Sequence, residues 1–147
     1  MTDLICIVEG GNSLHVTVLE IHNDANLPSF EDLEISVLVE TNGFVGHNSS
    51  IGILRDDFMK FASDLLKLEQ SRQGRTVLKS MSPDDLNLSI ESISRLGHMY
   101  VSGTVGKWCR VGPKPFMSSV GFGFEIEPTL LVDLSRSDLV QKYSKTV

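Results

Sequence analysis

Strand-like alternation of apolar and polar residues recurs on both sides of one helical segment, and this pattern most constrains the fold. In residues 33–40 the apolar side chains alternate with polar ones, which is typical of an antiparallel strand with one buried face. Asn42-Gly43 follows directly and is a strong signal for a tight hairpin turn. A return strand is therefore expected at about 44–53.

Two more strands are expected before this hairpin, over residues 4–8 and 13–22. The second begins with regular alternation, but Leu19 and Ile21 interrupt it. This interruption predicts a β-bulge, or a strand that is covered on both sides near that end. Residues 23–29 have the composition of a loop.

The apolar period changes to that of an amphipathic helix over about residues 54–70. The apolar positions fall three or four residues apart, at Leu54, Phe58, Phe61, Ala62, Leu65 and Leu68. Asp56 and Asp57 occupy the expected first turn, where negative charge complements the helix dipole.

The second half of the chain predicts strands again, at 75–80, 85–92, 97–106 and 118–126. Residues 109–117 contain Pro113 and Pro115 and are expected to form a loop. Pro128 suits the first position of a C-terminal helix over about 128–143. The apolar stripe of that helix loses register at 135–138, so a break is expected there.

These elements follow the order ββββ-α-ββββ-α and predict an α+β fold. Strands joined by short turns form an antiparallel β-sheet, here of about six to seven strands. Two helices (about 54–70 and 128–143) are expected to pack on one face of it. The length suits one ordinary domain, and no linker or low-complexity segment divides it, so residues 1–147 are expected to form a single domain.

The chain has a net charge of −6 and therefore repels phosphate backbones, which argues against nucleic acid as a partner. The same charge suits a basic protein partner, although plain solubility is the simpler explanation. No apolar run approaches the length of a membrane span or a signal peptide, so a cytoplasmic protein with no membrane partner is expected. Cys6 should pack as a small apolar residue, and its pairing with Cys109 stays open.

His98 has the titration range of a general base and follows Gly97 at the start of an expected strand. No nucleophile motif surrounds it, so we expect a structural or solvent-exposed role and predict no catalytic residue. His15 and His22 are seven residues apart on a strand and should point to opposite faces. Because no histidine pair has helical spacing and no C-x-x-C occurs, we predict no metal site and no cofactor.

Acidic residues cluster in turns and near the start of the first helix, where backbone capping explains them. The alternative is an acidic rim that binds a partner. Trp108 ends a strand and either anchors an interface or covers the core. The candidate partner-binding residues are Glu31, Asp32, Glu34, Asp84, Asp85 and Trp108.

Much of the chain resembles a group of small bacterial proteins of mostly unassigned function. The resemblance covers about residues 50–135 and rests on the stretches DDFMKFASDLLKL, LNLSIESISRLGHMYVSGTVGKW and GFGFEIEPTLLVDL. Some members of this group are labelled immunity proteins of wall-associated polymorphic toxins. The resemblance implies no catalytic residues, and it implies a structural role for Gly97-His98, as a turn glycine and a strand-start histidine.

The first functional hypothesis is a non-enzymatic protein-binding domain of the immunity type, which neutralises a cognate toxin by occlusion. An acidic surface would speed its association with a basic toxin. The alternative is a small-molecule-binding domain with a pocket between sheet and helices. Open edge strands would also allow a homodimer.

These hypotheses predict different structures. A protein-binding domain should have an acidic or aromatic surface patch and no deep polar pocket. A ligand-binding domain should have an apolar cavity with convergent polar groups. An enzyme, the least expected class, should place His98 within hydrogen-bond reach of an acid or a nucleophile.

Overall fold

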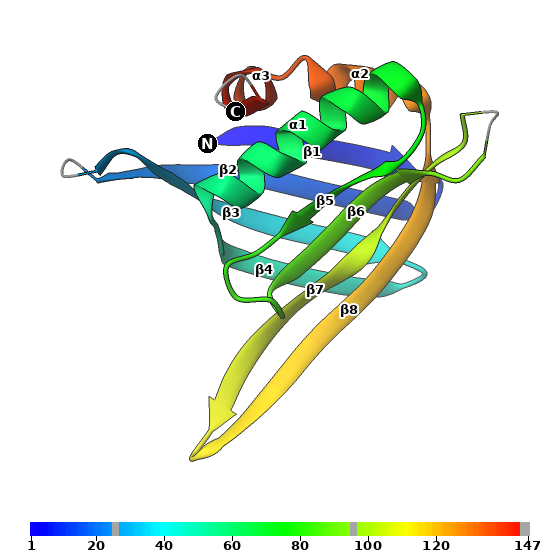
Figure 1. The fold of residues 1–147 in the computed structure, drawn as a ribbon. Coiled ribbons are helices and arrows are strands. Elements are labelled where there is room, and N and C mark those ends of the chain that lie inside the picture. Colours follow the sequence, from blue (N-terminus) through cyan, green and yellow to red (C-terminus); the bar gives the residue numbers. More distant parts are fainter. Residues whose placement is uncertain (25–26, 95–96, 145–147) are drawn as a thin grey trace.

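The structure is a computed structural model, which describes residues 1–24, 27–94 and 97–144 (Figure 1). Within these ranges, the side chains of 23–24 and 27–31 are not described. This part of the chain forms eight strands in two four-stranded antiparallel sheets, together with three helices. The α+β class is confirmed. The prediction of a single sheet of six to seven strands with two helices fits only in part, because the eight strands form two sheets and the C-terminal helical segment forms two helices.

The first sheet is a meander of β1 (Thr2–Glu9), β2 (Asn12–Asp24), β3 (Leu27–Thr41) and β4 (Phe44–Ile53). Asn42 and Gly43 both have positive φ angles, of 50° and 83°, and they form the predicted tight turn between β3 and β4. The loop predicted at 23–29 is wrong over most of its described residues, because β2 and β3 continue through them as a longer hairpin.

A bulge in β2 changes which side chains face outward. The pairing with β3 shifts between Val18 and Glu20, which confirms the predicted irregularity. The extra residue reverses the alternation beyond it. His15 and His22 therefore share the outer face of the sheet, and the prediction that they point to opposite faces is wrong.

The second sheet is a meander of β5 (Arg75–Lys79), β6 (Leu86–Ser92), β7 (Met99–Val111) and β8 (Lys114–Ile126). The loop predicted at 109–117 is wrong, because β7 and β8 pair continuously up to a turn at Gly112 and Pro113. Pro115 lies within β8 without disrupting the ladder. This is physically consistent, since β8 is an edge strand and proline lacks only a donor.

The two sheets meet without forming a common ladder. Gly46 of β4 lies so close to β7 and β8 that a Cβ there would be 2.7 Å from Cγ1 of Val105. Beside it the Asn48 amide donates to the carbonyl of Gly106 at 2.7 Å. The missing side chain at Gly46 thus lets β4 pack closely against β7 and β8 of the second sheet.

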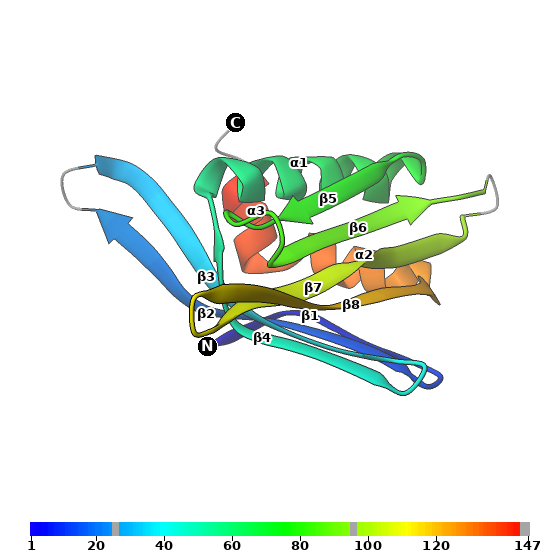
Figure 2. The same ribbon diagram turned by 90° about the horizontal axis from the view of Figure 1, so that it is seen from below.

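The three helices lie together over the opening between the two sheets (Figures 1 and 2). They are α1 (Arg55–Ser71), α2 (Pro128–Ser135) and α3 (Asp138–Ser144). The predicted C-terminal helix breaks between Ser135 and Asp138, as its apolar pattern indicates. None of the helices in the described ranges is long and apolar enough to cross a membrane.

One hydrophobic cluster joins both sheets and all three helices. The apolar face predicted for the first helix is buried in it, and Phe58 meets the ring of Tyr143 edge to face at 4.9 Å. The hydroxyl of Thr76 in β5 donates to the Phe61 carbonyl at 2.8 Å and so ties the helix to the second sheet.

The end of the β7–β8 hairpin projects beyond this core (Figure 1). We call residues 107–119 the β7–β8 arm. All of its side chains are exposed except that of Met117, which is half-buried. The β2–β3 hairpin also extends past the body of the molecule (Figure 2).

Candidate functional site

The β7–β8 arm presents apolar side chains to solvent on a regular two-stranded scaffold. Trp108, Val111 and Phe116 are 51%, 67% and 44% exposed. Trp108, Cys109, Arg110 and Pro115 line a hollow on the arm surface. Trp108 therefore has the exposure of an interface anchor, one of the two roles considered from the sequence.

Two of the predicted acidic residues meet the arm at its base. The indole N–H of Trp108 donates to Oδ2 of Asp84 at 3.1 Å. The neighbouring Asp85 accepts the backbone N–H of Gly106 with its main-chain carbonyl at 3.0 Å. Burial raises the pKa of the Asp85 carboxyl, the charge of Asp84 adds to the rise, and Lys107 opposes it.

The charge of the arm is opposite to that of the whole chain. It contains Lys107, Arg110 and Lys114 and no acidic residue, whereas the chain has a net charge of −6. The ammonium group of Lys114 lies 5.4 Å from the centre of the Phe116 ring. The arm is therefore a basic and apolar surface bordered by the Asp84–Asp85 turn.

The other predicted acidic residues belong to the first sheet. Asp32 is buried, and its Oδ1 accepts the backbone N–H of Arg55 at 2.8 Å, so it stabilises the start of α1. The side chain of Glu31 lies outside the described residues. Glu34 is on the outer face of β3. Of the candidates with described side chains, Asp32 and Glu34 thus belong to the first sheet, whereas Trp108 belongs to the second.

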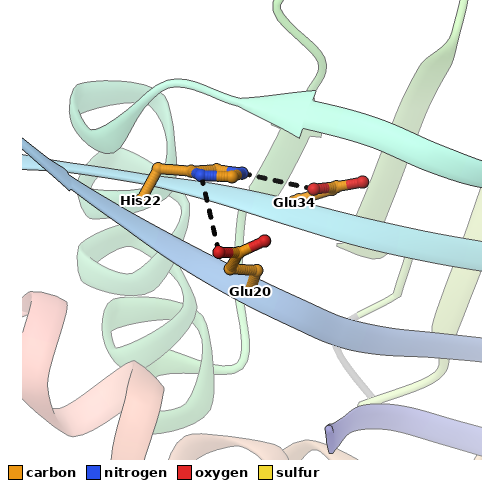
Figure 3. Close-up of side chains that lie close together, drawn as sticks. All are labelled: Glu20, His22 and Glu34. Carbon is orange, nitrogen blue, oxygen red and sulfur yellow. Dashed lines mark hydrogen bonds and ion pairs between the residues drawn. The ribbon is translucent and has the colours of Figure 1, made fainter.

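Glu34 is instead part of a cluster with Glu20 and His22 (Figure 3). His22 Nε2 lies 3.2 Å from Oε2 of Glu34, and His22 Nδ1 lies 3.9 Å from Oε1 of Glu20. Ser50 of β4 donates to Oε1 of Glu34 at 2.9 Å. The hydrogen bonds from Ser50, and then from His22, lower the pKa of the Glu34 carboxyl and favour its ionised form.

This cluster was not predicted from the sequence, although a signal for it was present. Glu20 and His22 are two residues apart on a strand, so they lie on the same face. The hairpin then places Glu34 directly opposite Glu20. Recognising the arrangement required the position of the bulge, because strict alternation would turn Glu20 and His22 toward the core.

His98 meets the geometric condition that we set for an enzyme. Its Nδ1 lies 2.8 Å from Oε1 of Glu125, and both side chains are about half exposed. They line a surface hollow together with Glu9 and Glu127. The contact described for the His98 ring is the one with Glu125. That the protein has no catalytic residue stays a prediction.

A cavity of about 270 Å³ lies between β1 and α2. Most of its lining is apolar, including Ile5, Ile7 and Leu131, and the lining also includes Asp3 and Asp133. This is the location expected for the small-molecule alternative, between a sheet and the helices. Its volume falls just below the range of sites that hold drug-sized ligands.

Both cysteines are free and exposed. The prediction that Cys6 is packed in the core is wrong, because the pairing of β1 shifts between Asp3 and Ile5. Leu4 and Ile5 are both buried as a result, while Cys6 faces outward, 3.5 Å from Nδ1 of His15. Cys109 belongs to the arm.

We compared the chain with models of protein families, with curated proteins and with solved structures, and nothing matches it. The resemblance to immunity proteins therefore stays a prediction from the sequence. Arguments about function rest on the geometry described above.

Proposed function

We propose that this chain is a non-enzymatic protein-binding domain of the immunity type, which neutralises a toxin by inserting the β7–β8 arm into its cleft. The observation that carries the proposal is the exposure of Trp108, Val111 and Phe116 on a projecting hairpin. Aromatic side chains of this kind dominate binding energy when a partner covers them.

The arm is suited to insertion because its shape is formed before binding. Its strands pair along their whole length, from Lys107 with Ser118 to Val111 with Lys114. The hydrogen bond between Trp108 and Asp84 orients the indole at the base. A preformed hairpin loses little conformational entropy on association, and this favours affinity.

The charges of the arm define the chemistry of its partner. Arg110 shares one face of the arm with Trp108, and Lys107 and Lys114 share the other face with Phe116. The matching cleft would therefore offer apolar contacts and acidic groups on both of its walls. This differs from the basic partner expected from the net charge. The difference arises because the arm is basic within an otherwise acidic chain.

If a toxin-like domain is encoded next to this protein, the test is to co-express the two and to count the surviving cells. The wild-type chain should restore growth and co-purify with the toxin domain, whereas the double variant Trp108→Ala, Phe116→Ala should lose both effects. Phe44→Ala is the matched control, because Phe44 is an exposed aromatic residue outside the arm. Circular dichroism shows that each variant is folded.

Two results would overturn the proposal. Failure of the wild-type chain to protect against the encoded toxin would remove the immunity role. Protection by the double variant equal to that by wild type would remove the arm as the contact surface.

The cavity between β1 and α2 supports a second candidate function, the binding of a small apolar molecule. Asp3 and Asp133 in its lining favour a ligand with an amino group. A panel of small alkyl and aryl amines should then raise the unfolding temperature. Leu130→Trp, which enlarges a residue of the lining, should abolish the effect, and an unchanged response would contradict this function.

A further inference from the structure

Glu20 and Glu34 form an unfavourable pair in the described structure. They are directly opposite each other on β2 and β3, where two like charges destabilise a hairpin. No lysine or arginine forms an ion pair with either carboxylate among the described residues; the ion-pair partner of both is His22. The cluster therefore places one imidazole and two carboxylates, all of them metal-ligating groups, close together on an exposed face.

We propose that Glu20, His22 and Glu34 bind a Zn²⁺ ion on the outer face of the first sheet (Figure 3). One imidazole nitrogen and two carboxylate oxygens are a ligand set that zinc accepts. The fourth position would be filled by water, since the cluster faces solvent. The site is separate from the β7–β8 arm, and its existence does not depend on the proposed function.

The distances agree with this ligand set. Two bonds of about 2.0–2.2 Å that meet at a tetrahedral angle hold their ligand atoms about 3.4 Å apart. His22 Nε2 and Glu34 Oε2 are already 3.2 Å apart. One ligand atom from each of the three residues can be chosen so that all lie within 4.8 Å of one another.

Only Glu20 has to move to complete the site. It now lies beside Nδ1 of His22, whereas the ion would bind at Nε2 next to Glu34. The Glu20 side chain is 64% exposed and carries rotatable bonds, so a change of rotamer meets little resistance. The Ser50 hydroxyl donates to Oε1 of Glu34, and this hydrogen bond orients the carboxylate whose Oε2 would bind the ion.

The open side of the cluster is toward β2, where Glu20 and His22 are exposed. On the other side, the residue of β4 opposite Glu34 is Gly52, and the side chain of Met81 lies over it, 3.6 Å from where a Cβ would be. Two irregularities in strand pairing lie next to the cluster, between Val18 and Glu20 in β2 and between Asn48 and Ile51 in β4, and they turn Glu20 and Ser50 to the same face. Bulges often position side chains in this way next to functional sites.

The experiment is a calorimetric titration of the reduced, full-length protein with Zn²⁺ alone. We expect one ion per chain, with affinity lowered more than about tenfold in His22→Ala and in Glu34→Gln. His47→Ala is the control, because His47 is another exposed histidine on this face of the same sheet. It should bind zinc as wild type does.

A second measurement separates this site from the Cys6–His15 pair, which also contains metal-ligating atoms. The absorption spectrum of the Co²⁺-loaded protein should lack the charge-transfer band of a thiolate ligand. That band, the absence of zinc binding in wild type, or wild-type affinity in both variants would overturn the proposal. Unfolding curves without metal establish whether both variants fold. If His22→Ala does not fold, Glu34→Gln still tests the site, because glutamine keeps the shape of the glutamate side chain.

Discussion

Asp32 is a residue on which the start of α1 depends. The N-cap residue, Leu54, offers no side-chain hydrogen bond, and the carboxylate of Asp32 reaches across from β3 to the backbone N–H of Arg55. Asp32→Ala should lower the free energy of unfolding by about 1–2 kcal/mol, because it removes a buried cap. Urea denaturation measures this change.

The matched control for this prediction is Asp56→Ala. Asp56 is also acidic and near the start of α1, but its side chain is 92% exposed. It should cost only a few tenths of a kcal/mol through the helix dipole. Equal losses in the two variants would show that the charge, and not the buried hydrogen bond, stabilises the helix.

Asp85 should make stability depend on pH. Its pKa is raised above the ordinary 3.8, mainly by burial, so the folded state binds the proton more tightly than the unfolded chain. The free energy of unfolding should therefore fall as the pH rises through the interval just above 3.8. The folded protein carries the resulting penalty at neutral pH.

Asp85→Asn removes that penalty, because asparagine is neutral throughout. The variant should be more stable than wild type at pH 7, and the advantage should shrink as the pH approaches 3.8. Urea unfolding at a series of pH values tests this prediction. A difference between the two proteins that grows toward low pH would contradict it.

At the scale of the elements, Gly103 is a position in β7 that only glycine fits. Its φ is 154°, and a Cβ would run into the backbone carbonyl of Asn87 on β6. Gly103→Ala should destabilise the fold by on the order of 3 kcal/mol, because backbone atoms of two paired strands would have to separate.

Gly121 provides the comparison for this substitution, since it lies in the partner strand β8, next to Gly103 in the ladder. The nearest atom to a Cβ on Gly121 is 3.9 Å away, which is ordinary contact. Gly121→Ala should therefore change stability by less than about 0.5 kcal/mol. Thermal unfolding of both variants measures their stability. Similar losses of stability would show that alanine destabilises the hairpin at either position, whatever the local space.

The elements themselves could largely be predicted from the sequence, because their evidence is local. Side-chain alternation indicates a strand wherever one face is buried, as in β3, and the helical period indicates α1. The strands of the arm were not predicted, because both of its faces are exposed and the prolines near its turn are typical of loops. An exposed hairpin has no buried face to impose alternation.

The division into two sheets could not be predicted, because it depends on contacts between distant strands. At their junction, Gly46 packs against Val105 and Val120. The residues near Gly46 in the sequence do not predict this contact. The candidate sites show the same limit. Trp108 and Asp84 were both named as candidates, but their contact depends on how far β7 extends.

At the scale of the whole molecule, the arm and the core should be separable. Lys107 and Ser118 are paired, so an Asn-Gly turn can join them in place of residues 108–117. This shortened chain should keep a free energy of unfolding within about 1 kcal/mol of wild type, because the removed side chains are almost all exposed. It should also lose the proposed toxin binding.

Chemical denaturation and the protection assay together test this separation. A shortened chain that no longer unfolds cooperatively would show that the arm stabilises the core. A shortened chain that is stable and still protects cells would place the contact surface elsewhere.

The meander order of the strands also has a consequence for synthesis. In the described ranges, each strand pairs only with strands next to it in the sequence, and the first four strands end at Ile53. On a ribosome, this sheet can form while most of the chain is still unmade. Its inner face, with Leu14, Val16 and Ile35, is covered in the finished fold, partly by elements that are translated later. The first sheet, before the later elements cover it, is therefore the intermediate most prone to aggregation. Its uncovered apolar face is also the surface that a chaperone would bind.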